Sequence, residues 1–165
     1  MFAHLNSIGL YGMDAFEVNV EADISNGLPG FDVVGLPDTA VKESRDRVRS
    51  ALKNCGFTFP MSRITVNLAP ADKRKEGPIY DLPILLAILT ASGQLSCDLS
   101  DCAMIGELSL SGEIHGIRGV LPMAIHAKEL GYHRLFVPAV NAAEGAVVEG
   151  LEVYPVTNVK QLIDH

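Results

Sequence analysis

The most constraining feature of the sequence is an apolar segment in the middle of the chain. Residues 82–91 read LPILLAILTA, and apolar side chains would occupy nearly every side of a helix formed by this segment. A helix that is apolar all round has to be enclosed by other elements, so we expect a central buried helix from about Asp81 to about Ser92, ended by Gly93. The segment has about half the length that a bilayer requires, so neither a membrane span nor a membrane partner is predicted.

The rest of the chain must supply the layers that enclose this helix. Alternating apolar and polar residues predict strands at 16–22, 31–34 and 63–68, the second returning from the first through a turn at Asn26-Gly27. Further strands are expected at residues 103–107, 113–117, 135–137 and 151–154, and further helices at 121–130, at 141–144 and from about Asn158. Strands that come in pairs early and alternate with helices later favour a single α+β domain over residues 1–165, a mixed sheet with its helices mainly on one face.

An amphipathic helix is predicted between Asp38 and about Asn54. The Asp38 carboxylate can accept hydrogen bonds from the free amides of the first helical turn, which is the N-cap role. One stripe of the helix is apolar and should pack inward: Val41, Val48, Leu52 and Cys55. Arg45 and Arg49 fall off this stripe, so we expect them in solvent.

The charge of the chain limits its contacts with nucleic acid to local patches. A net charge of −7 and a pI of about 5.1 argue against a surface that coats nucleic acid over the whole domain, because such surfaces are usually basic. Two basic groups stand out in the sequence: Lys42, Arg45, Arg47, Arg49 and Lys53, and the adjacent cations Lys73, Arg74 and Lys75.

The second group lies in the loop between Pro70 and Pro78 and is the best candidate for contact with DNA phosphates. Such contacts add salt-dependent affinity but do not read sequence. No aromatic residue interleaves with Lys73, Arg74 and Lys75 in the sequence, so base stacking is not predicted. The alternative is a solvated loop, or an ion pair across a subunit interface.

Other chemistries find little support in the sequence. The five histidines are scattered and form no ligand pair, so no metal site is expected: His4, His115, His126, His133 and His165. The cysteines are odd in number, and we interpret them as reduced: Cys55, Cys97 and Cys102. Two acidic pairs, Asp98 with Asp101 and Glu144 with Glu149, lack a framing motif and are interpreted as caps or solvated faces. Asp81 is predicted to be the N-cap of the central helix.

Two segments carry a pattern more specific than periodicity. Residues 73–83 read KRKEGPIYDLP, and residues 106–122 read GELSLSGEIHGIRGVLP. Together with VVGLPD at 33–38 and NLAPA at 67–71, they resemble the signature blocks of the Lon proteolytic domain, in the version found at the front of ComM/YifB proteins, the Mg-chelatase-like ATPases. The resemblance spans essentially the whole chain, with the motifs in the right order. It implies a Lon-protease-like fold, similar to the ribosomal-protein-type domain 2.

The resemblance also implies that the catalytic pair of that family is missing. A Lon protease uses a serine after the Gly-Pro dipeptide as nucleophile and a downstream lysine as its base, and the chemistry requires both. Here Gly77-Pro78 is followed by Ile79, and Leu121 occupies the lysine position. Isoleucine cannot attack a carbonyl and leucine cannot accept a proton, so we expect no catalytic residue in this chain.

A displaced pair made of Ser109 or Ser111 with Lys128 is the alternative site. Ser111 is expected in a hairpin turn, Ser109 at a polar strand position and Lys128 on a solvated helix face. These positions favour structural roles for all three residues.

The resemblance implies a non-catalytic accessory domain of a ring-forming ATPase motor, associated with branch migration during recombination and transformation. Its implied partners are its own AAA+ module, further copies in a hexamer, and DNA. The sequence has no Gly-x-x-x-x-Gly-Lys-Ser/Thr loop, so we expect no cofactor in this chain and ATP with magnesium in the AAA+ module. We expect a cytoplasmic chain that is one domain of a longer protein.

Three alternatives from other functional classes remain at this point. The chain could be an active Ser-Lys peptidase of the Lon type, part of a magnesium-chelatase-type motor, or a structural oligomerisation domain without a ligand.

Overall fold

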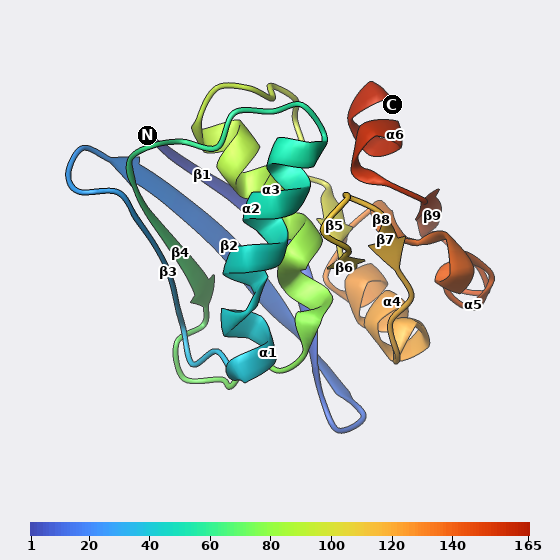
Figure 1. Ribbon diagram of the computed structural model, residues 1–165. Helices are drawn as coiled ribbons and strands as arrows, with labels where there is room; N and C mark the ends of the chain where they lie inside the picture. Colours follow the sequence, from blue (N-terminus) through green and yellow to red (C-terminus); the bar gives the residue numbers. More distant parts are fainter.

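The computed structural model describes all 165 residues and shows a seven-stranded mixed sheet with helices on both faces (Figure 1). The strand order is β3-β4-β2-β1-β5-β8-β9, and β6 and β7 form a separate two-stranded hairpin. The strands are β1 (Phe2–Tyr11), β2 (Asp14–Ser25), β3 (Gly30–Val34), β4 (Arg63–Ala69), β5 (Cys102–Met104), β6 (Glu107–Leu108), β7 (Ile114–His115), β8 (Arg134–Pro138) and β9 (Glu152–Val156). The helices are α1 (Thr39–Lys42), α2 (Ser44–Asn54), α3 (Asp81–Ala91), α4 (Val120–Glu129), α5 (Ala142–Gly145) and α6 (Val159–Asp164), with 3-10 turns η1 (Pro78–Tyr80) and η2 (Ala139–Asn141).

Helix α3 is the centre of the larger core, as predicted. All of its residues except Thr90 are buried. One side of α3 packs on β1 and β2, and α2 lies beside α3 on the same side of the sheet (Figure 1). The helix expected from Asp38 to Asn54 is present as α1 and α2, which are separated only by Glu43, a residue that keeps right-handed helical dihedral angles. The Asp38 carboxylate caps α1 by accepting from the Val41 amide at 2.8 Å, and Arg45 and Arg49 are exposed as expected.

The sheet is buried on both faces where β1, β5 and β8 meet. Met104 and Phe136 belong to the core around α3, whereas Ile8, Ala103 and Leu135 belong to a second core under α4. Successive residues of a strand point to opposite faces, so α3 and α4 lie on opposite sides of the sheet. Helices α1, α2 and α6 share the α3 side and α5 packs with α4, which agrees with a mixed sheet whose helices lie mainly on one face. No helix is both long and apolar enough to cross a membrane.

Strand β1 is absent from the sequence-based prediction. Its residues from Leu5 to Gly9 are buried or nearly so on both faces, so the apolar and polar alternation that identifies a half-exposed strand is missing. It pairs antiparallel with β2 along its full length, from Phe2 opposite Asp23 to Tyr11 opposite Asp14.

Two further strand expectations are wrong in detail. Strand β3 does not return beside β2, because β4 lies between them, antiparallel to β2 and parallel to β3. The strand expected at 103–107 is divided into β5 and β6. The chain leaves the main sheet after Met104, where the Ile105 amide donates to Phe136 O and the Gly106 amide donates to Ile79 O.

Candidate functional site at the Gly77-Pro78 loop

The loop before η1 is fastened to the start of α1 by backbone hydrogen bonds. The Lys75 amide donates to Leu36 O and the Asp38 amide donates to Lys75 O, both at 3.0 Å. The second oxygen of the Asp38 carboxylate accepts from the Gly77 amide at 3.1 Å. Gly77 has a φ of +80°, which a residue with a side chain would adopt only with strain. One carboxylate therefore caps α1 and also positions the Gly77-Pro78 turn.

Lys75 lies inside the protein, which corrects the expectation that three adjacent cations face solvent. Its side chain is fully buried and its Nζ donates to Pro70 O. The backbone pairing with residues 36–38 turns this side chain inward, whereas the flanking Lys73 and Arg74 are exposed. Burial lowers the pKa of the Lys75 ammonium, because the charged form loses its water.

The two exposed cations of this loop have different partners, an aromatic ring for Lys73 and a carboxylate for Arg74. Lys73 Nζ is 5.0 Å from the centroid of the Phe16 ring, and Arg74 Nε is 3.4 Å from Glu76 Oε1. A groove of about 420 Å³ is lined by Tyr11, Asp14, Ala15, Phe16, Lys73 and Arg74. The sequence-based prediction found no aromatic neighbour because Tyr11 and Phe16 are more than fifty residues away along the chain.

Ile79 is part of the apolar packing. It is half-buried in η1 and contacts both the core around α3 and the core under α4. Its carbonyl accepts from the Gly106 amide at 2.8 Å, and the Gly106 carbonyl accepts from the Leu82 amide at 3.1 Å. The residue that follows Gly77-Pro78 is thus an apolar side chain whose backbone is hydrogen-bonded to Gly106.

A cleft of about 590 Å³ opens beside Ile79. Its polar lining consists of the side chains of Asp38, Glu76, Glu107 and Arg118. No group of three histidine, cysteine, aspartate or glutamate side chains is close enough together to hold a metal ion. Leu121, in the first turn of α4, is 36% exposed, does not line this cleft, and donates its amide to Glu144 Oε2 at 2.9 Å.

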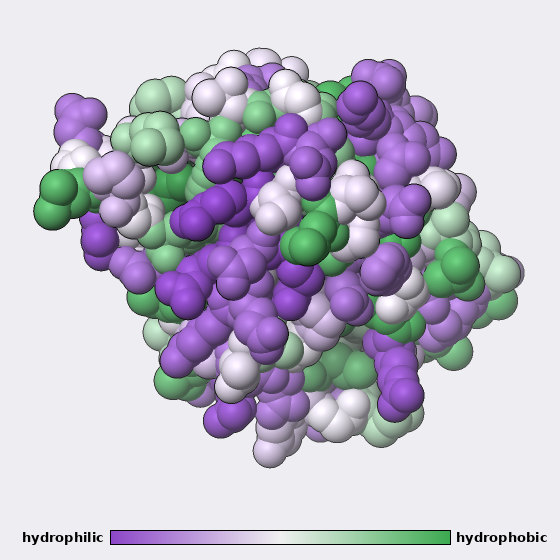
Figure 2. Space-filling view, viewed as in Figure 1, coloured by the Kyte–Doolittle hydropathy of each residue, from purple (hydrophilic) through white to green (hydrophobic).

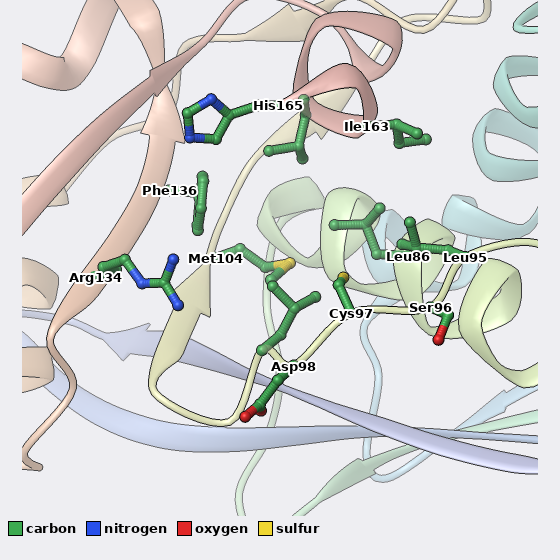
Figure 3. Close-up of a pocket in the computed structure, with 12 residues that line it drawn as sticks. Leu86, Leu95, Ser96, Cys97, Asp98, Met104, Arg134, Phe136, Ile163 and His165 are labelled. Atoms are coloured by element: carbon green, nitrogen blue, oxygen red, sulfur yellow. The ribbon is translucent and has the colours of Figure 1, made fainter.

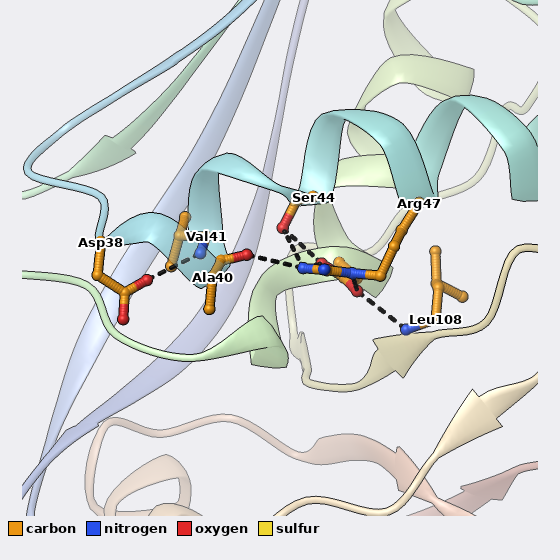
Figure 4. Close-up of polar contacts among 7 residues, drawn as sticks. Asp38, Ala40, Val41, Ser44, Arg47 and Leu108 are labelled. Carbon is orange, nitrogen blue, oxygen red and sulfur yellow. Dashed lines mark hydrogen bonds and ion pairs between the residues drawn. The ribbon is translucent and has the colours of Figure 1, made fainter.

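The Asp81 carboxylate accepts four hydrogen bonds, from Ser44, Arg47 and Leu108, the partners that are labelled in Figure 4. It is fully buried and accepts from Ser44 Oγ at 2.5 Å, from Arg47 Nε at 2.6 Å and Nη2 at 3.1 Å, and from the Leu108 amide at 3.0 Å. These bonds join α3 to α2 and to β6. Burial tends to lower the pKa of Arg47, but the bond and the charge of Asp81 outweigh it, and the net direction is upward.

The prediction that Asp81 is the N-cap of the central helix is therefore wrong. It is the first residue of α3, it follows the η1 turn, and no side-chain cap is present at that helix end. The carboxylate points instead toward α2 and β6, where the Arg47 guanidinium and the Ser44 hydroxyl donate to its oxygens in place of the amides of the first turn of α3.

The alternative serine-lysine pair is engaged in a turn. The Ser109 and Ser111 hydroxyls are 3.0 Å apart in the hairpin between β6 and β7, and Ser109 Oγ accepts from the Glu113 amide at 3.0 Å. Lys128 is exposed on α4, where its side chain lies over Gly150. These contacts agree with the structural roles expected for the three residues.

A second cavity, of about 270 Å³, lies on the α3 side of the sheet near α6 (Figure 3). Leu86, Met104 and Phe136 form part of its apolar lining, and Arg134 and His165 lie at its polar edge. Arg134 Nη2 donates to Asp101 Oδ1 at 2.7 Å, so its charge is already paired. The cysteine that lines the cavity, Cys97, is exposed and forms no disulfide.

Comparisons with known proteins agree with this picture of a Lon-like framework. A family model described as subunit ChlI of Mg-chelatase matches residues 20–141. The YifB protein of Salmonella typhimurium is 49% identical over 138 residues, which cover 83% of this chain and 27% of that protein. Competence protein ComM of Haemophilus influenzae is 47% identical over 144 residues, covering 87% of this chain and 28% of its own length.

A more distant relative is the Lon protease of Mycolicibacterium smegmatis, 26% identical over 168 residues that cover 94% of this chain and 21% of the protease. The chain spans less than a third of the length of each of these relatives. A family model that covers most of the chain, together with relatives at nearly half identity, shows that this chain belongs to the Mg-chelatase-like ComM/YifB family.

Proposed function

We propose that this chain is a non-catalytic accessory domain of a ComM/YifB-like ATPase. It would support the assembly of a ring and the engagement of DNA by a motor that acts in branch migration, recombination and transformation. The observation that carries the proposal is Ile79, which stands after Gly77-Pro78 and packs into both cores. A peptidase needs a reachable hydroxyl and a base at this site, and an apolar side chain built into the packing supplies neither.

We assign ATP binding and hydrolysis to another region of the full-length protein. The chain has no phosphate-binding loop, and its relatives are more than three times as long as the segment that matches. We propose an AAA+ module that binds ATP and magnesium, forms a hexamer and is the immediate partner of this domain.

DNA engagement is proposed at the groove beside Lys73 and Arg74. Lys73 is exposed and has no carboxylate partner, and Arg74 is 64% exposed with only its Nε facing Glu76, so both can contact phosphates. Tyr11 in the same groove is 63% exposed, so an unpaired base can stack on its ring. The aromatic neighbours make a single-stranded segment, such as one at a branch point, the form of DNA that suits this groove.

The test is a fluorescence anisotropy titration of the 165-residue chain with labelled single-stranded and branched DNA at low salt. The double variant Lys73→Gln with Arg74→Gln should bind more weakly, and Tyr11→Ala should weaken binding of the single strand more than that of a duplex. Lys128→Gln with Lys160→Gln removes the same charge from exposed positions elsewhere and is the matched control. Absence of binding at low salt would refute the DNA part of the proposal.

A further inference from the structure

Four exposed cations follow one side of the α1–α2 pair. Their spacings of three, four and four residues place them on the same face of a helix: Lys42, Arg45, Arg49 and Lys53. At a rise of about 1.5 Å per residue, they extend over roughly 16 Å. We call these four residues the α2 ridge.

The charges of the α2 ridge are not neutralised by any carboxylate of the protein. The four side-chain ion pairs that involve an arginine use other residues, Arg47, Arg63, Arg74 and Arg134, and no ridge residue is paired with a carboxylate. Two carboxylates, Glu43 and Asp46, lie on the same helices and moderate the local charge without pairing with the ridge. Arg47 is the inward-facing exception in this segment, because Asp81 neutralises it.

Two ridge side chains are held in place while they stay exposed. Arg45 Nε donates to Lys42 O at 3.2 Å, and the Arg49 guanidinium lies 5.1 Å from the centroid of the Phe59 ring. A guanidinium that is already restrained loses less conformational entropy when it binds a phosphate, and its flat shape suits two hydrogen bonds to one anion.

The composition of this surface argues against a protein partner. Protein interfaces have an apolar centre that is depleted in charge, whereas no apolar residue of α1 or α2 is exposed. Figure 2, seen from the same direction as Figure 1, shows mostly hydrophilic side chains over these two helices. The net charge of the chain is −7, so a row of four cations is a local exception to its acidic surface. Such a row matches the regularly spaced charges of a linear polyanion.

We propose that the α2 ridge is a second nucleic-acid contact, which binds the phosphate backbone without reading sequence. The inference rests on the proposed function only for the identity of the polyanion as DNA, since the residues are separate from Lys73 and Arg74. Each cation that neutralises a phosphate releases counterions, so the binding constant K falls as salt rises and log K against log salt has a negative slope. Each such cation should increase the magnitude of that slope by about 0.9 on a duplex and about 0.7 on a single strand.

The experiment measures this slope for the 165-residue chain by fluorescence anisotropy. The variant in which all four ridge residues become glutamine should reduce the magnitude of this negative slope on a duplex by roughly 3 to 4 and weaken binding at low salt. Each half, Lys42→Gln with Arg45→Gln and Arg49→Gln with Lys53→Gln, should lower it by roughly half as much. Since all four side chains are exposed, unchanged thermal unfolding shows that the fold is intact.

Two reference variants separate this proposal from the DNA site proposed above. Lys128→Gln with Lys160→Gln changes the net charge as much as one half of the ridge and should leave the slope unchanged. If the ridge variants keep the wild-type slope and binding is lost only in Lys73→Gln with Arg74→Gln, the proposal that the ridge binds nucleic acid is overturned. The proposed function is then left intact. No DNA binding by the unmodified chain would overturn both.

A competition titration decides between nucleic acid and an acidic protein as the partner. Poly-L-glutamate should displace DNA from the ridge only at a higher charge concentration than unlabelled DNA. Equal displacement by the two polymers would overturn the assignment to nucleic acid.

Discussion

Replacing Asp81 by asparagine should destabilise the fold by about 3 kcal/mol. Asparagine keeps one acceptor oxygen, but it removes the charge and places an NH₂ group where a second acceptor faces Arg47 and Ser44. Breaking a buried ion pair costs about 3–5 kcal/mol, because the remaining charge stays buried without a partner. The Arg47 side chain is 20% exposed, so water can solvate part of the guanidinium and the cost should fall at the lower end of that range.

Urea unfolding followed by far-ultraviolet circular dichroism measures this change, since the chain has no tryptophan. Asp46→Asn, on the same side of the molecule but exposed and without a partner, is the matched control and should change stability by less than about 0.5 kcal/mol. Arg47→Gln and the double variant complete a cycle whose coupling energy should be at least about 1 kcal/mol. A cost below about 1 kcal/mol for Asp81→Asn, or additive effects in the cycle, would refute the view that this carboxylate ties α3 to α2.

Three further predictions concern other parts of the chain. Gly35→Ala should cost at least about 2 kcal/mol in urea unfolding, because Gly35 has a φ of +106° and an added Cβ would lie 2.3 Å from Leu68 O. Because the pKa of buried Lys75 is lowered in the folded state, the unfolded chain binds more protons than the folded chain just below pH 10, and the free energy of unfolding rises with pH there. This gain as the pH approaches 10 should be smaller in Lys75→Met than in the parent chain. A fluorophosphonate probe should label neither Ser109 nor Ser111, and mass-spectrometric detection of an adduct on either would restore the peptidase alternative. Ile79→Ser should also remain unlabelled, because Leu121 supplies no base.

The elements that could be predicted from the sequence are those whose pattern is local. The almost entirely apolar run 82–91 predicts a buried helix without knowledge of its neighbours, and Asp38 caps α1 through an amide three residues away. Strand β1 shows the opposite case. Its burial on both faces results from α3 and α4, so the strand has no alternation of its own to detect.

The candidate site depends on contacts between distant segments and was predicted less well. Lys75 looks like an exposed loop residue until its backbone pairs with Leu36 and Asp38 and turns the side chain inward. Asp81 has the position of a helix cap, but Arg47, thirty-four residues earlier, provides a stronger partner. In each case the deciding contact is tertiary, and local propensity carries no information about it.

The double packing of Ile79 opposes the introduction of a nucleophile at this position. A serine there would remove apolar surface from both cores at once, so a step back toward a nucleophile would weaken the fold before any base was present to make the hydroxyl useful. Stability and nucleophilic chemistry would thus oppose each other at this one residue, whereas exposed positions elsewhere on the domain can acquire new contacts without the same cost.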